Sequence, residues 1–100
     1  VHVCQEEAAV KRLLAAMKLD KDELRVCYRA LLQHMPRDMI SFAEMAGVTQ
    51  AQGAFALAVL GEIELIEFEA APFRVRMLPM QKRDPEESTL YQLIHRVLEA

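Results

Sequence analysis

Four helix-start signals divide this chain, and their spacing limits what it can fold into. In each signal a cap residue is followed three positions later by Glu or Gln, so that the two side chains can satisfy free backbone N–H groups reciprocally. The four pairs are Asp20–Glu23, Ser41–Glu44, Thr49–Gln52 and Asp84–Glu87. With 100 residues in total, we expect one domain built mainly from short helices.

Apolar residues at helical spacing give the first two predicted helices a buried stripe. The first helix covers roughly residues 5–18, and its apolar positions are Val10, Leu13, Leu14 and Met17, at i, i+3, i+4 and i+7. The second begins after Asp20 and ends at Pro36, because proline disfavours helical geometry at the residue before it. Its predicted buried face holds Leu24, Cys27, Tyr28, Leu31, Leu32 and Met35.

A short helix, a tight turn and a longer helix follow. Ser41 is the predicted cap of the segment SFAEMAG, residues 41–47, and Gly47 is its predicted left-handed stop. Thr49 caps the next helix, which we extend to about Ile63. Two helices joined by a glycine-containing turn are typical of a helix-turn-helix motif.

The last third of the chain predicts a β-hairpin and a closing helix. The segments LIEFE (65–69) and FRVRML (73–78) read as strands joined by residues 70–72. Asp84 and Pro85 are a typical helix start, and apolar residues stripe the helix that follows at Leu90, Leu93, Ile94, Val97 and Leu98. We therefore predict a mainly α fold with a small β-hairpin (α+β), in the order of a winged helix-turn-helix domain with an added N-terminal and C-terminal helix.

We divide the chain into three parts. Residues 1–18 form an N-terminal helix, which either belongs to the domain or trails from a preceding one. Residues 19–78 form the winged-helix-like domain, and residues 79–100 form a linker and the closing helix.

Composition excludes several classes of protein. A hydrophobic content of 53% excludes an intrinsically disordered chain, and no apolar run approaches the ~18 residues of a membrane-spanning helix. The first residues lack the pattern of a signal peptide. Two cysteines, Cys4 and Cys27, read as reduced thiols. We therefore expect a cytoplasmic protein with no membrane partner.

Charge is strongly segregated along the chain, although the net charge is only −3. Residues 38–73 hold six acidic residues and no Lys or Arg, whereas residues 74–83 hold Arg74, Arg76, Lys82 and Arg83 and no acid. Each segment is either a solvated face or, in the sharper interpretation, an acidic middle beside a basic patch that would contact a polyanion.

No catalytic constellation is present. The cysteine–histidine pairs are His2–Cys4, near the chain end, and Cys27–His34, about 10 Å apart along a helix, which is too far for one zinc ion without other ligands. We predict no catalytic residue and no metal ligand, with Cys27 in the core and the glutamates of residues 62–69 on a solvated face.

Two stretches resemble the C-terminal domain of the RecJ family of bacterial single-strand-specific exonucleases: FALAVLGEIELIEFE (55–69) and RVRMLPMQKRDPEESTLYQLI (74–94). In that family a helix typically ends "ALxVFEELGLI", and a hairpin and a "KxDLEESxxY" segment follow. Residues 82–88 and Tyr91 carry the tail match, and residues 22–31 are similar to the family's first domain helix, so the resemblance covers about residues 19–94.

The helix end is where this chain departs from the family. Glu64 stands where the family usually has glycine, and Gly61 lies about one turn earlier. Because mid-helix glycine costs up to ~1 kcal/mol, the helix ends either near Leu60 or at about Ile63.

The resemblance implies an accessory docking domain without catalysis of its own, from a single-stranded-DNA-specific exonuclease of DNA repair and recombination. Its catalytic core, with a divalent metal, would lie elsewhere in a longer parent, and this chain would hold no cofactor. The implied partners are the parent's other domains, single-stranded DNA, and the acidic–hydrophobic tail of single-strand-binding protein.

Two sets of residues are candidate binding sites. The first binds nucleic acid or the partner tail through cations and a stacking ring: Arg74, Arg76, Lys82, Arg83 and Phe73. The second docks protein through Leu57 and Leu60, on a helix face that is either exposed or covered by a terminal helix, and through Met77 and Met80 beside the arginines.

The alternative function is a winged-helix DNA-binding module of a transcription regulator. Such a module would place the helix of residues 49–63 in the major groove. That helix contains no Lys or Arg, and DNA affinity rests largely on phosphate neutralisation, so duplex recognition is disfavoured.

Overall fold

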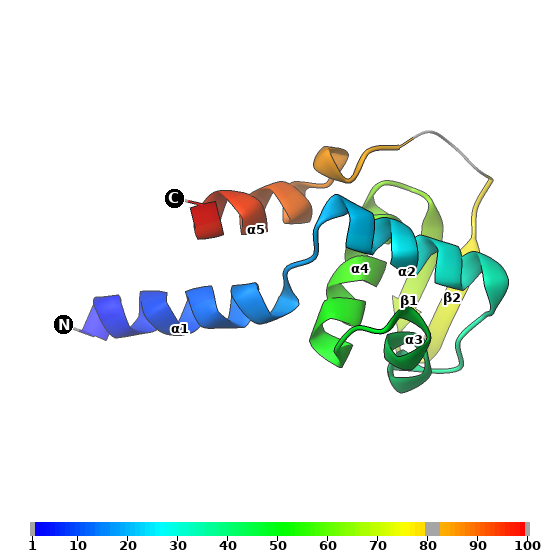
Figure 1. Cartoon of the computed structure of the whole chain (residues 1–100), viewed down its shortest axis with the longest axis horizontal. Coiled ribbons are helices and arrows are strands. Elements are labelled where there is room, and N and C mark those ends of the chain that lie inside the picture. The colour runs from blue at the N-terminus through cyan, green and yellow to red at the C-terminus, as the bar shows by residue number, and fades with distance from the viewer. Residues whose placement is uncertain (1, 80–82, 100) are drawn as a thin grey trace.

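The computed structural model describes residues 2–79 and 83–99, with the side chains of residues 8–79 and 83–98. The elements in chain order are α1 (His2–Met17), α2 (Lys21–Gln33), α3 (Met39–Ala46), α4 (Gln50–Glu62), β1 (Ile66–Ala70), β2 (Phe73–Met77), the short 3-10 helix η1 (Pro85–Glu87) and α5 (Thr89–Glu99). The predicted α+β class, mainly helical with a two-stranded antiparallel hairpin, is confirmed (Figure 1).

The molecule is elongated because two helices project from its body. The overall extents are 47 × 27 × 22 Å, and α1 and α5 contact each other and run side by side away from the other elements (Figure 1). The body consists of α2, α3 and α4 with the hairpin. No helix in the part of the chain that the structure describes has the length and apolar character needed to cross a bilayer.

Helix α4 is the centre of the core. Six of its residues are buried: Gly53, Phe55, Ala56, Leu57, Val59 and Leu60. A helix that is apolar on every side must be covered on every side, and α1, α2, α3, α5 and β1 all contact α4. Two further residues at its ends, Leu65 and Ile66, continue the core into the hairpin.

A glycine lets α3 and α4 approach closely. A Cβ atom added at Gly53 would lie 3.3 Å from both Met39 Sδ and Phe42 Cδ2. Phe42 is fully buried, so its ring has little room to move away. The absence of a side chain at Gly53 is therefore part of how these two helices pack.

The predicted helix starts of α2 and α4 are confirmed. The backbone N–H of Asp20 donates to the Glu23 carboxylate at 3.2 Å. At α4, Thr49 Oγ1 accepts from the backbone N–H of Gln52 at 3.1 Å, and the Gln52 side chain accepts from the Thr49 backbone N–H at 3.0 Å. Both are capping boxes.

The predicted start of α3 was wrong, although its end is confirmed. The cap is Asp38, whose carboxylate accepts from the backbone N–H of Ser41 at 2.8 Å, so Ser41 lies inside the first turn. Asp38 occupies the cap because its carboxylate is the better acceptor for a helix N-terminus. Gly47 ends the helix at φ 71°, in the left-handed region.

Helix α2 is shorter and less buried than predicted. It ends at Gln33, three residues before Pro36. Leu24, Cys27 and Leu31 are buried as expected, and Tyr28 is half-buried. Leu32 is 50% exposed on α2, and Met35, which lies beyond the end of α2, is 53% exposed.

Helix α4 continues through Gly61 to Glu62, so of the two expected ends the longer is confirmed. The backbone N–H of Leu65 donates to the Leu60 carbonyl at 3.0 Å, and that of Glu64 to the Gly61 carbonyl at 3.2 Å. This is the Schellman arrangement, which requires a left-handed residue after the helix. Glu64 takes that position at φ 62°.

The hairpin has a two-residue turn and a single register. Its pairs are Ile66 with Met77, Glu67 with Arg76, Phe68 with Val75, Glu69 with Arg74 and Ala70 with Phe73. The turn is Ala71–Pro72, joined by a cis peptide bond. Because side chains alternate between the faces of a strand, the four charged residues share one face, and the apolar pairs share the other.

The closing helix begins later than predicted. The capping box at Asp84 forms, with the Asp84 N–H donating to Glu87 at 2.9 Å, but it closes only the single turn of η1. Ser88 is extended, with φ −77° and ψ 127°, and α5 begins at Thr89. The break follows from a second, long-range cap on α5, which Glu62 supplies.

Candidate partner-binding site

The hairpin does not bring the predicted basic patch and its aromatic residue together. Arg74 and Arg76 lie on one face, whereas Phe73 and Met77 lie on the other. Arg76 Nη2 lies 3.5 Å from Glu67 Oε1, and Arg74 stands opposite Glu69. Phe73 therefore does not lie beside the two arginines, and one of them, Arg76, is already paired with a carboxylate.

Of the apolar residues predicted to dock a protein, those that the structure describes are mostly not available at the surface. Leu57 and Leu60 are 0% and 2% exposed, so their predicted exposure was wrong. The alternative, that this helix face is covered, is confirmed: the terminal helices α1 and α5 contact α4, and the internal strand β1 contacts it as well. Met77 is half-buried, and Met80 and Lys82 lie outside the described residues.

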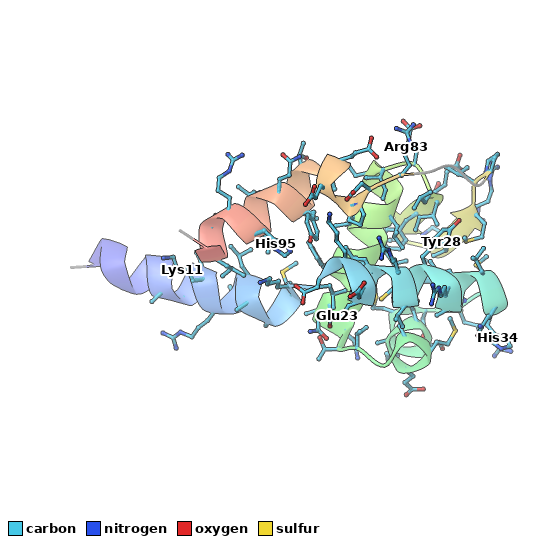
Figure 2. The ribbon with its side chains drawn as sticks, turned by 45° about the horizontal axis from the view of Figure 1, so that its top comes forward. Lys11, Glu23, Tyr28, His34, Arg83 and His95 are labelled. Carbon is cyan, nitrogen blue, oxygen red and sulfur yellow. The ribbon has the colours of Figure 1, made fainter. Side chains whose placement is uncertain are left out.

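An open pocket of about 780 Å³ lies between α2, the end of α4 and the segment that enters η1. We call it the α2 pocket. It is lined by Leu24, Arg25, Tyr28, Leu60, Ile63, Leu65, Arg83, Asp84, Pro85 and Glu87. Figure 2 shows Tyr28 on α2 and Arg83 on the segment before η1. Its volume falls within the range of ligand and peptide pockets.

The α2 pocket has an apolar floor and a charged rim. Arg25 and Arg83 belong to the rim from two different elements. The Arg25 side chain is 63% exposed and pairs with Asp22 at 3.4 Å, within α2 itself. Arg83 Nη1 lies 3.5 Å from Glu87 Oε1, and Nη2 lies 3.9 Å from Glu64 Oε2. Such exposed pairs are weak and exchange readily.

Ion pairs hold η1 against the start of α2, which closes one end of the pocket. Lys21 Nζ lies 3.3 Å from Asp84 Oδ1 and 2.9 Å from Glu86 Oε1. The hydrogen bond to Glu86 raises the pKa of Lys21. The pKa of Asp84 is lowered, first by the backbone N–H of Glu86 and then by Lys21.

On the other side of η1, Glu62 fixes the start of α5 by capping that helix from a distant position in the sequence. Its Oε2 accepts from the Ser88 hydroxyl at 2.7 Å and from the Leu90 N–H at 3.3 Å, and its Oε1 accepts from the Thr89 N–H at 2.7 Å and from the Thr89 hydroxyl. Ser88 Oγ in turn accepts from the Tyr91 N–H at 3.1 Å. These bonds, led by the hydroxyls of Thr89 and Ser88, lower the pKa of Glu62 to about 2.

Neither the pocket nor the role of Glu62 was predicted from the sequence, in which Glu62 was interpreted as part of a solvated acidic face. The partners of Glu62 lie 26 to 28 residues away, so no local pattern links them. Of the predicted site residues in the described ranges, Arg83 and Leu60 line the α2 pocket.

Among the side chains that the structure describes, the remaining ones that could act as nucleophiles or metal ligands are those of Cys27 and of the His, Asp and Glu residues. Cys27 is buried, and desolvation raises the pKa of its thiol to about 11, so it is a poor nucleophile. Among residues 2–79 and 83–99, no group of three or more His, Cys, Asp or Glu could hold a metal ion. Comparison of the chain with protein-family models, with curated proteins and with solved structures finds no significant match.

Proposed function

We propose that this chain is a docking domain, without catalysis of its own, that binds an acidic and apolar tail of a partner protein in the α2 pocket. The observation that carries the proposal is the composition of that pocket. Leu60, Ile63 and Leu65 give it an apolar floor, and Arg25 and Arg83 stand on its rim. Apolar anchors of the tail would fill the floor while its carboxylates form charge-assisted hydrogen bonds to the arginines.

The resemblance to the RecJ exonuclease family favours the same role. Arg83, Asp84, Pro85 and Glu87, from the segment that carries the most specific part of the resemblance, line the α2 pocket. Glu64, at the position where the family usually has glycine, has the left-handed geometry that glycine adopts without strain. The tail of single-strand-binding protein has the required chemistry, so we propose it as the partner class.

The order of α2, α3, α4, β1 and β2 is that of a winged helix-turn-helix domain, and we propose that this is its fold. In that reading the parent is a cytoplasmic exonuclease of DNA repair and recombination. Its other domains would carry the catalytic core and its divalent metal, and they would be further docking partners of this chain.

Two alternatives have less support. A transcription-regulator module would need α4 in a major groove, but α4 carries no cation and Gly53, Leu57 and Leu60 are buried. Single-stranded DNA on the hairpin would meet Glu67 and Glu69 beside Arg74 and Arg76. A phosphate backbone requires a continuous strip of cations along its length, and these carboxylates interrupt such a strip.

The test is a titration of the ¹⁵N-labelled chain with a synthetic peptide of three aspartates followed by two large apolar residues and a free carboxyl end. We expect amide shifts at Leu24, Tyr28 and Leu65, and at least tenfold weaker binding by the Arg25→Glu variant. Arg29→Glu is the matched control, because Arg29 is exposed on the same helix but does not line the pocket.

Two results would contradict the proposal. One is the absence of shifts along α2 and residues 83–87, and the other is equal weakening by the two charge reversals. Binding of a thymidine oligonucleotide or a duplex with a steep salt dependence would favour the nucleic-acid alternatives instead.

A further inference from the structure

A second groove lies between the hairpin and the connection between α2 and α3, along β2 and over the charged face that β2 shares with Glu67 and Glu69 of β1. It has a volume of about 550 Å³. Its lining residues are Met35, Pro36, Arg37, Glu67, Glu69, Phe73, Arg74, Val75 and Arg76. Four consecutive residues of β2 thus take part, which is most of the strand. We call this space the edge groove.

The edge groove exists because the neighbouring segment does not pair with β2. The chain leaves α2 in extended geometry, with His34 at φ −143° and ψ 136°, but Pro36 has no N–H and cannot extend a ladder. Among the described residues the sheet has two strands, and no backbone hydrogen bond joins residues 34–37 to β2. The outer edge of β2 therefore presents unpaired backbone donors and acceptors, which another strand can use.

The side chains beside this edge differ between the two faces of the strand. Arg74 and Arg76 lie on one face, and the half-buried Phe73 and Val75 lie on the other. Arg37 stands across the groove, so three cations (Arg37, Arg74 and Arg76) face two carboxylates (Glu67 and Glu69). Arg76 pairs with Glu67, whereas within the described ranges neither Arg37 nor Arg74 forms a salt bridge. The pKa of Asp38 is lowered, first by the backbone N–H of Ser41 and to a smaller degree by the charge of the neighbouring Arg37. Met35 adds an apolar surface that is 53% exposed.

We infer that the edge of β2 accepts an extended segment of a partner protein as a third strand, in which carboxylates alternate with apolar side chains. Alternation places the carboxylates beside Arg74 and Arg37 and the apolar side chains beside Phe73 and Val75. The backbone edge selects a polypeptide over an oligonucleotide, since only a peptide supplies donors and acceptors at strand spacing. This site is separate from the α2 pocket and does not depend on it.

The test uses the whole 100-residue chain and the capped probe peptide acetyl-Glu-Val-Glu-Val-Glu-amide. We expect amide shifts at residues 73–77, and slower hydrogen exchange at those β2 amides that face the edge. Arg37→Glu should weaken binding at least tenfold, and because Arg37 lies outside the hairpin this change leaves the strand pair intact. Arg12→Glu, an exposed position on α1, is the matched control.

The same peptide with alternate amides N-methylated keeps its charges but loses its strand donors, so we expect it not to bind. Equal binding of the methylated peptide would overturn strand addition, and equal affinity of the Arg37→Glu and Arg12→Glu variants would overturn the charge assignment. Self-association of the chain through residues 73–77, or displacement of the peptide by a thymidine oligonucleotide from those residues, would assign the edge to another occupant and would also overturn the proposal.

Discussion

The two ends of α4 are held in different ways. The helix packs through apolar contacts as far as Leu60, with Gly53 against Met39 and Phe42 and with Phe55 and Leu57 buried. Its last residue makes polar contacts instead, because the Glu62 carboxylate caps α5. Since the α2 pocket is lined from the second end, its shape depends on hydrogen bonds and charges, whereas the stability of the body depends on the first.

The largest expected effect is on the apolar half. Leu57→Ala removes a fully buried side chain, and we expect it to lower the free energy of unfolding by about 2–5 kcal/mol. Urea denaturation followed by circular dichroism measures this. The control is Leu32→Ala, because Leu32 is 50% exposed and its truncation should cost far less. Equal losses from the two changes would contradict the central place of α4.

The two helical glycines of α4 should respond in opposite directions. Gly53→Val places atoms against Met39 and Phe42, so we expect a loss of about 1–3 kcal/mol in the free energy of unfolding. At Gly61 the nearest atom to an added Cβ is Phe68 Cβ, at 4.0 Å, which is an ordinary contact. Gly61→Ala should therefore stabilise the chain by up to about 1 kcal/mol. Thermal denaturation of the two variants compares them directly, and a gain from Gly53→Val would refute the packing argument.

The polar end predicts a dependence on pH. The pKa of Glu62 is lowered to about 2 from its ordinary value of 4.5, so its contribution to stability is present above pH 4.5 and is lost as the pH falls towards 2. Glu62→Gln should lower the free energy of unfolding by about 1 kcal/mol at pH 7, a figure reduced from the shift because the group is exposed to solvent. Urea denaturation from pH 2 to pH 7 measures it.

Glu44→Gln is the matched control for this change, because Glu44 is an exposed helical glutamate. The difference in stability between the wild-type chain and Glu62→Gln should shrink below pH 4. A difference that stays constant across this range would show that the carboxylate charge has no part in capping α5.

The contrast between local and long-range contacts also explains which features of the fold could be predicted from the sequence. Asp20 with Glu23 and Thr49 with Gln52 form as expected, because a cap and its partner lie three residues apart. The prediction of Ser41 as the cap of α3 was wrong, because the Asp38 carboxylate, three residues earlier, accepts from the Ser41 backbone N–H. Local signals thus identify most helix starts. They fail at Ser41, where two acceptors compete, and at Asp84, where a long-range cap from Glu62 starts the closing helix at Thr89 instead.

The candidate site depends on contacts that local signals do not contain. The α2 pocket needs Lys21 to hold Asp84, and Glu62 to cap α5, across many intervening residues. The separation of Phe73 from Arg74 could have been predicted from the sequence, since alternation along a strand places neighbouring side chains on opposite faces. Burial of Leu57 depends on how the other helices and the hairpin pack around α4, which the apolar pattern of α4 alone does not specify.

The smallest expected effect is a gain at the polar end. Glu64 is a non-glycine residue at φ 62°, where an L side chain costs about 1–2 kcal/mol. Glu64→Gly should relieve that cost and lose only the long ion pair to Arg83 at 3.9 Å, for a net gain of about 1 kcal/mol in the free energy of unfolding. Glu64→Ala is the control, because it loses the same ion pair while keeping the Cβ atom, so it should not stabilise the chain. Chemical denaturation of the three proteins separates the two contributions. If glycine and alanine behave alike, the left-handed geometry of residue 64 has no energetic consequence, and the end of α4 is held by its backbone hydrogen bonds without measurable strain.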